Sequence, residues 1–257
     1  MLLVVCAEAS AQLAYWDISP LYDTQTSPFY DDEAYTPTGR YGWNEERYAR
    51  KVQQVASVID SLSLPLIALY GVENEAVVRA ITTRCKGDYS YLHTTLNTLD
   101  GLEFALLYYG DLFFPEQMEP RQRALHIKGL YRGEQVSILL IADPRVGASL
   151  VEEVREREAD HRLIVAGRCE GIDAERFALH DAHAQAAKAG RGTTLRSSGW
   201  QMRERILIDS TYRLRRGDVF MRRWLLESRR GAPLATYEKG LYRGGVSKHL
   251  PVFAYFE

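Results

Sequence analysis

Two short runs of apolar residues limit the folds that this chain can adopt. Residues 66–70 read LIALY, and residues 163–167 read LIVAG. Each run has the length of a β-strand, and neither alternates with polar residues, so neither strand can keep one face in water. Both strands therefore belong in a sheet that is covered on its two faces by helices or by a second sheet.

The segments around these strands predict an α/β fold. Residues 45–62 are expected to form an amphipathic helix, because Asn44 is a suitable N-cap and apolar residues follow at helical spacing. Several predicted strands follow one another without a helix between them, which predicts mixed sheets. No linker divides the chain, so we expect one domain over residues 1–257 with two layers of sheet inside helices. Further helices are predicted over residues 75–85 and 148–160, and further strands over residues 102–109, 124–130, 135–141, 202–208 and 249–255.

The charge balance gives no sign of a nucleic-acid-binding field over the whole molecule. Thirty-two Lys and Arg residues stand against 34 Asp and Glu residues, so the net charge is −2. A local basic patch stays open at the arginine-rich stretch 213–230, which we interpret as a solvated helix face.

The compartment is predicted from the cysteines and the first residues. The chain has three cysteines and no C-x-x-C pair, which is typical of a reduced protein. No apolar run reaches the ~18 residues of a membrane span. Met1–Ala11 resembles the end of a signal peptide but lacks a positively charged start. We therefore favour a cytoplasmic location, with an exported or periplasmic one as the alternative if Met1–Ala11 is the remnant of such a signal.

Polar residues appear abruptly where predicted strands end. The carboxyl ends of strands are where open α/β sheets usually build their sites, so we expect the functional residues at these places. The five strand ends are residues 16–19 (WDIS), 70–74 (YGVEN), 141–145 (IADPR), 167–170 (GRCE) and 247–251 (SKHLP).

Six segments resemble motifs of the endonuclease/exonuclease/phosphatase superfamily, which has the deoxyribonuclease-like fold. They follow the family's order and together span nearly the whole chain. The resemblance implies a four-layer sandwich in which two mixed β-sheets pack face to face and are flanked by helices. It also implies Mg²⁺-assisted hydrolysis of phosphodiesters or phosphomonoesters. The segments are residues 14–24 (AYWDISPLYDT), 35–48 (YTPTGRYGWNEERY), 69–74 (LYGVEN), 101–108 (GLEFALLY), 165–170 (VAGRCE) and 242–252 (YRGGVSKHLPV).

The positions that match the family's catalytic residues are mostly changed. His249 alone keeps the family's residue type. Gly71 stands where the resemblance implies the metal-binding glutamate, and Arg168 stands where it implies the aspartate that activates water. Lys248 replaces the aspartate before the final histidine. The other changed positions are Asp17, Asp143, Glu170 and Glu204, in place of an asparagine, a histidine, an asparagine and an aspartate.

These exchanges argue against metal-dependent catalysis. Gly71 offers no ligand, and the guanidinium of Arg168 keeps its proton in a protein, so it is no base. We expect Arg168 and Lys248 to form a buried neutral cluster with Asp17 and Glu170 in place of the metal. The first hypothesis is therefore a pseudoenzyme with a binding or scaffold role, with no cofactor.

Two alternatives stay open at this point. One is an active Mg²⁺-dependent phosphodiesterase, nuclease or phosphatase with a rebuilt site. The other is a non-catalytic binder of a phosphorylated ligand through Arg168, Lys248 and His249. A phosphorylated small molecule or a nucleic acid would be the partner, and a scaffold role would add a protein partner. A rebuilt metal site would draw on Asp17, Glu73, Glu170 and Glu204.

Overall fold

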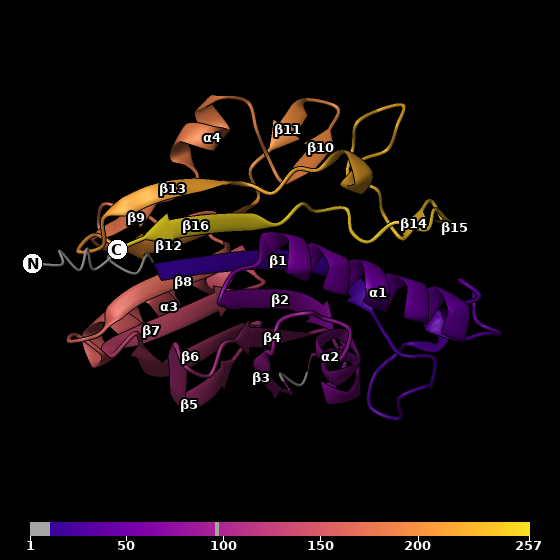
Figure 1. Ribbon diagram of the computed structural model, residues 1–257, viewed down its shortest axis with the longest axis horizontal. Helices are drawn as coiled ribbons and strands as arrows, with labels where there is room; N and C mark the ends of the chain where they lie inside the picture. Colours follow the sequence, from indigo (N-terminus) through magenta and orange to yellow (C-terminus); the bar gives the residue numbers. More distant parts are fainter. Residues whose placement is uncertain (1–10, 96–97) are drawn as a thin grey trace, which may run out of the picture.

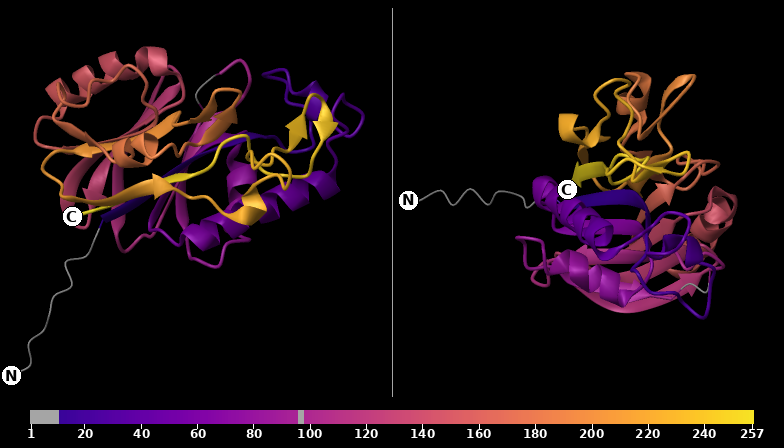
Figure 2. Two further views of the ribbon diagram at one scale, coloured as in Figure 1. Left: turned by 90° about the horizontal axis from the view of Figure 1, so that it is seen from above. Right: turned by 90° about the vertical axis from the view of Figure 1, so that its right-hand side faces the viewer.

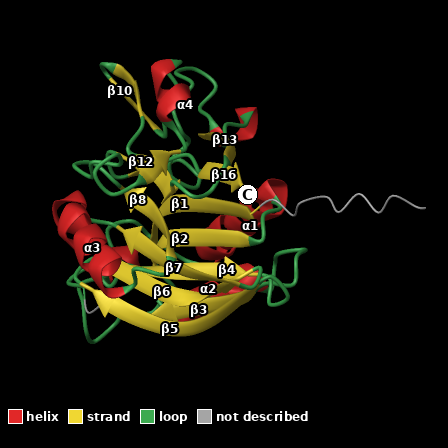
Figure 3. Cartoon of the chain, turned by 90° about the vertical axis from the view of Figure 1, so that its left-hand side faces the viewer, coloured by secondary structure: helices red, strands yellow, loops and turns green. Residues whose placement is uncertain are grey.

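The computed structural model describes residues 11–95 and 98–257, and its centre consists of two six-stranded mixed β-sheets packed face to face (Figure 1). Helices lie on the outer side of both sheets, which gives the four layers seen in Figure 3. The predicted four-layer α/β sandwich is confirmed.

The first sheet contains the strand with which the described part of the chain begins. Its neighbours β1 and β2 are parallel, and the other pairs are antiparallel. In spatial order the strands are β13 (Leu214–Val219), β16 (Val252–Phe256), β1 (Ala11–Leu21), β2 (Leu66–Val72), β4 (Glu103–Tyr108) and β3 (Ser90–Thr94).

The second sheet also has one parallel pair, formed by β7 and β8, among antiparallel neighbours. In spatial order its strands are β5 (Phe113–Arg121), β6 (Ala124–Tyr131), β7 (Glu134–Ile141), β8 (Arg162–Arg168), β12 (Glu204–Asp209) and β9 (Leu179–Asp181). Two small sheets pair β10 (Thr194–Arg196) with β11 (Gly199–Gln201) and β14 (Tyr237–Glu238) with β15 (Leu241–Tyr242).

The longer helices pack on the sheets through apolar stripes. Helix α1 (Glu45–Leu62) begins at Asn44, whose side chain accepts a hydrogen bond from the Arg47 N–H, and it contacts β1 (Figure 2). Helix α2 (Glu75–Thr82) contacts α1 and β3, and α3 (Pro144–Arg157) contacts β7 and β8. The remaining helical segments are the short α4 (Ala184–Lys188) and the 3₁₀ turns η1 (Glu33–Tyr35) and η2 (Arg223–Leu225).

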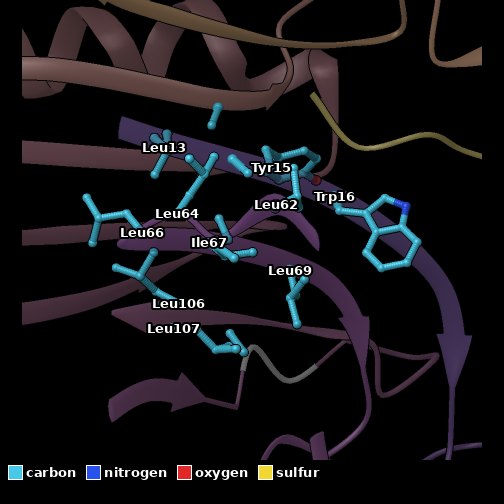
Figure 4. Close-up of a cluster of buried hydrophobic side chains, with 14 of the residues drawn as sticks. Leu13, Tyr15, Trp16, Leu62, Leu64, Leu66, Ile67, Leu69, Leu106 and Leu107 are labelled. Carbon is cyan, nitrogen blue, oxygen red and sulfur yellow. The ribbon is translucent and has the colours of Figure 1, made fainter. Parts of the chain in front are cut away.

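Strand β2 shows why the run LIALY predicts a covered strand. Ile67 and Leu69 are fully buried, and so are Leu66 and Ala68, whose side chains point to the opposite face. Figure 4 shows several of these residues packed with Leu13 and Tyr15 of β1. Both faces of the strand are buried, so this sheet has no solvent face here.

The arginine-rich stretch 213–230 is not a helix, so the interpretation as a solvated helix face is wrong. It begins with β13, which pairs with β16, and it continues as the turn η2. The charges are compensated locally, since Arg215 pairs with Glu257 and Arg216 lies 3.8 Å from Asp218. Because β13 is a strand paired with the C-terminal strand β16, its residues do not follow the spacing of a helix.

The structure bears on the membrane prediction but not on the compartment. In residues 11–95 and 98–257, no helix is both long enough and apolar enough to cross a membrane. The segment Met1–Ala11 lies outside the described residues except for its last residue, so its interpretation as a signal remnant stays a prediction.

Candidate functional site

Three of the five predicted strand ends, residues 16–19, 70–74 and 247–251, meet at a cavity of about 460 Å³. Asp17 and Ser19 reach it from the end of β1, and Gly71 reaches it from the end of β2. Because β1 and β2 are parallel neighbours, their carboxyl ends open at the same edge of the sheet. Lys51 of α1 and His249, which precedes β16, complete this wall.

Asp17, Glu204 and His249 form a group of interacting charges. The His249 Nδ1 lies 2.9 Å from the Glu204 Oε1, and the His249 Nε2 lies 3.8 Å from the Asp17 Oδ2. Glu204 is 1% exposed. The imidazole therefore has a carboxylate partner, although the neighbouring position 248 is a lysine.

The electrostatics of this group favour a charged pair. Burial acts to lower the pKa of His249, but the carboxylates of Glu204 and Asp17 outweigh it and raise the pKa. Burial acts to raise the pKa of Glu204, but His249, Thr193 and Arg168 outweigh it and lower the pKa. The Asp17 carboxyl has its pKa raised, chiefly by burial. His249 and Glu204 therefore stabilise each other as imidazolium and carboxylate.

The backbone of Ser19 occupies the space that a side chain at position 71 would need. Gly71 has φ +99°, a conformation that L side chains rarely adopt, and a Cβ on it would lie 2.8 Å from the Ser19 carbonyl oxygen. Ser19 itself has φ 56°, and its N–H donates to the Asp17 Oδ1 at 2.8 Å. The chain thus bulges at Ser19 toward β2 and occupies the space where a longer residue 71 would begin.

A buried lysine, which the sequence reasoning missed, lies in the same wall. Lys51 is 1% exposed, and its Nζ donates to the Pro20 carbonyl oxygen at 2.7 Å. Burial lowers the pKa of Lys51 to about 7, although the carboxylate of Asp17 opposes that fall. The sequence does hold a signal for it: Lys51 comes three residues after Tyr48 and four before Val55, on the apolar stripe of α1.

Of the predicted buried cluster of Arg168 and Lys248 with Asp17 and Glu170, the Arg168–Glu170 pair is present, but the other two residues do not join it and the predicted burial is wrong. Arg168 binds Glu170 at 2.9 Å, and Glu170 is exposed. Lys248 is also exposed, and it forms no ion pair with another residue of the described ranges, while Asp17 faces His249. Arg168 sits opposite Glu204 in the β8–β12 ladder, so its second carboxylate comes from a neighbouring strand.

Two other predicted positions lie apart from the cavity wall. Asp143 caps α3 and binds the Arg145 side chain, which lowers the pKa of the carboxyl to about 2. Glu73 accepts hydrogen bonds from the Asp23 N–H at 2.5 Å and from the Tyr30 hydroxyl at 2.8 Å. Both carboxylates are therefore engaged in local structure.

Tyrosines line the other side of the cavity. Tyr35 and Tyr41 have ring centroids 4.8 Å apart, and Tyr41 and Tyr237 have centroids 4.7 Å apart. Tyr70 also contributes to the lining. Aromatic rings and several cations in the lining of one cavity suit a ligand with an anionic end and a less polar body.

The residues that could bind a metal ion here are Asp17, Glu204 and His249, whose donor atoms all lie within 4.8 Å of one another. This donor set is a poor match for Mg²⁺, which prefers an octahedron of oxygens. The His249 Nδ1 already lies 2.9 Å from the Glu204 Oε1, and a metal needs a neutral imidazole. The lysines of the same wall, Lys51 and Lys248, add positive charge where a dication would bind.

Comparisons with known proteins agree with this architecture. A family model described as the endonuclease/exonuclease/phosphatase family matches residues 12–136. A mannosyl-6-phosphatase from Bacteroides thetaiotaomicron is 12% identical with a TM-score of 0.64, and the alignment covers 96% of this chain and 100% of that one. D. rerio TDP2 humanized by 14 mutations is 13% identical with a TM-score of 0.59, covering 96% of this chain and 99% of that one.

A second protein of Bacteroides thetaiotaomicron, described as an endonuclease/exonuclease/phosphatase family protein, has a TM-score of 0.63 at 11% identity, covering 96% of this chain and 95% of that one. At such identities the structural likeness shows the fold alone. A search of curated proteins found no match. Residues 12–136 are therefore similar to the endonuclease/exonuclease/phosphatase family, and the fold of the described residues is that of solved proteins described as members of this family.

Proposed function

We propose that this protein is a non-catalytic member of the superfamily, which has lost metal-dependent phosphoester hydrolysis and acts by binding. The observation that carries this proposal is the contact between Gly71 and Ser19. A metal-binding glutamate at position 71 would need a Cβ 2.8 Å from the Ser19 carbonyl oxygen. The loss of that ligand therefore involves the backbone as well as the side chain.

The remaining groups support the same proposal. Arg168 stands at the place of the water-activating aspartate, and it stays protonated beside Glu170. The His249 Nδ1 and the Glu204 Oε1 lie 2.9 Å apart, so each charge has the other as its neighbour. Loss of one oriented catalytic group costs about 10²–10⁴ in rate, and here both the base and a ligand are missing.

Hydrolysis assays test the proposal directly. Bis(p-nitrophenyl) phosphate and p-nitrophenyl phosphate are incubated with the protein and either Mg²⁺ or Mn²⁺. We expect p-nitrophenol to appear no faster than in buffer. Turnover that disappears in Asp17→Asn, but persists in the matched exposed variant Asp88→Asn, would reject the proposal and favour the rebuilt metal site at Asp17, Glu204 and His249.

A specific observation favours one kind of binding function, that of a phosphorylated ligand. Lys248 and His249 line the cavity, as that hypothesis requires, and Lys51 and Lys239 line it with them. Arg168 does not belong to this lining because it pairs with Glu170. Thermal unfolding with adenosine monophosphate tests the idea: we expect a higher Tm, since a ligand that binds the native state stabilises it. An unchanged Tm with this nucleotide would remove the support for a nucleotide ligand.

A further inference from the structure

Lys51 is the least expected residue of the cavity, because it brings an ammonium group into the interior. The residue is 1% exposed, yet it belongs to the cavity lining. Its Nζ donates one hydrogen bond, to the Pro20 carbonyl oxygen, and it has no ion-pair partner within 4.0 Å in the described part of the chain. An ammonium has three N–H donors, so this geometry leaves donor capacity beside the cavity.

The charges that share this wall do not cancel. Three lysines, Lys51, Lys239 and Lys248, line the cavity, and Asp17 is the carboxylate among the described lining residues. The imidazole of His249 is balanced by Glu204 behind it. Below about pH 7, where Lys51 is charged, the lysines therefore exceed the aspartate by two positive charges, which makes the cavity attractive to an anion.

The three lysines differ in how exposed their side chains are and in how firmly the protein fixes them. Lys239 and Lys248 are exposed side chains, which water screens strongly. Lys51 is fixed by α1 and by its bond to Pro20, the residue that follows the Ser19 bulge. A fixed charge in a poorly solvated place interacts more strongly with a ligand than a mobile exposed one.

We propose that Lys51 supplies, from within the fold, the positive charge for binding a phosphate group in this cavity, so that binding needs no metal ion. This inference rests on the proposed function, because it assigns the phosphate-binding residue of the same site. Lys51 then donates hydrogen bonds to phosphate oxygens, and the exposed Lys248 and the imidazolium of His249 assist at the rim.

Calorimetric titration with inorganic phosphate tests the proposal. Inorganic phosphate contains no ester bond, so the result does not depend on whether the protein hydrolyses esters. The wild-type protein is titrated in EDTA at about pH 6, below the pKa of about 7 that burial gives Lys51, so that the side chain is charged. We expect binding in EDTA, and we expect added Mg²⁺ to leave the affinity unchanged.

Two variants identify the residue responsible. Lys51→Met removes the charge with a side chain of similar length, and we expect the affinity for phosphate to fall about tenfold or more. Lys188→Met is the matched control, because Lys188 is an exposed residue of α4 outside the cavity, and we expect no change. Circular dichroism verifies that each variant is folded.

Several outcomes overturn the inference. They are an affinity that is equal in Lys51→Met and wild type, phosphate binding that requires added Mg²⁺, and no binding by the wild-type protein. The last two need only the wild-type protein, so the test stands even if Lys51→Met does not fold. Release of p-nitrophenol from an ester, measured separately, would refute the loss of hydrolysis without bearing on Lys51.

Discussion

Replacement of Lys51 by methionine has an effect on stability that can be worked out from its burial. The pKa of Lys51 is about 7 in the folded protein, because burial penalises the ammonium, and 10.5 in an unfolded chain. The unfolded state therefore binds more protons between these two values. The free energy of unfolding of the wild-type protein should rise with pH from about 7 toward 10.5, and below 7 the whole penalty is present.

The size of the effect follows from the difference between the two pKa values. At low pH the buried ammonium costs about 5 kcal/mol of stability, at 1.36 kcal/mol for each pH unit. Lys51→Met abolishes this cost but also removes the hydrogen bond to the Pro20 carbonyl oxygen, which contributes about 1 kcal/mol. At about pH 6 the variant should thus be more stable than the wild type by up to about 4 kcal/mol. Between about pH 6 and about pH 9.5, this advantage should shrink by about 3 kcal/mol.

Urea unfolding of both proteins at several pH values measures the difference. His249 titrates in both proteins, and its contribution largely cancels when the two curves are subtracted, whereas the interaction of Asp17 with Lys51 remains part of the difference. Lys188→Met serves as the control and should follow the wild type at every pH. A difference between Lys51→Met and wild type that is independent of pH, or a variant that is less stable at pH 6, would refute the assignment of a buried ammonium.

Two further predictions concern the neighbouring residues. Gly71→Ala should lower the free energy of unfolding by about 1–3 kcal/mol in urea titrations, because its Cβ would meet the Ser19 carbonyl oxygen at a φ that suits glycine, whereas Gly110→Ala, where there is space, should change little. Glu204→Gln should lower the pKa of His249 in an NMR titration of the ring protons, since the carboxylate that favours the imidazolium is lost; an unchanged pKa would contradict the ion pair.

The sequence was sufficient to predict the elements whose patterns are local. The helix predicted over residues 45–62 is α1 with the same bounds, because its N-cap and its apolar stripe lie within one segment. Strand β5 was not predicted: it is an edge strand with two prolines and four polar residues, so its pattern does not resemble that of a buried strand. Such a strand is defined by its pairing with β6, which short-range patterns do not record.

The candidate site was likewise predictable in part. The convergence of Asp17, Gly71 and His249 followed from strand ends and from the family resemblance. The partners of the charged side chains could not be predicted, because they depend on the register between neighbouring strands. Arg168 faces Glu204 through the β8–β12 ladder, 36 positions apart in sequence, and its other carboxylate is two residues away. The carboxylate at i+2 binds the guanidinium and the one across the sheet acts on it through its charge, and only the fold shows the second influence.

The changes at this site form one connected structure. The bulge at Ser19 fills the space above Gly71, and the next residue, Pro20, provides the carbonyl that holds Lys51. Restoring a glutamate at position 71 alone would therefore leave a backbone collision and a nearby ammonium in place. Replacing Lys51 alone would still leave position 71 without a side chain that can bind a metal ion. On the proposed function, each change occupies space or charge that the others vacate, so the site is organised around the fixed cation Lys51 and not around a metal ion.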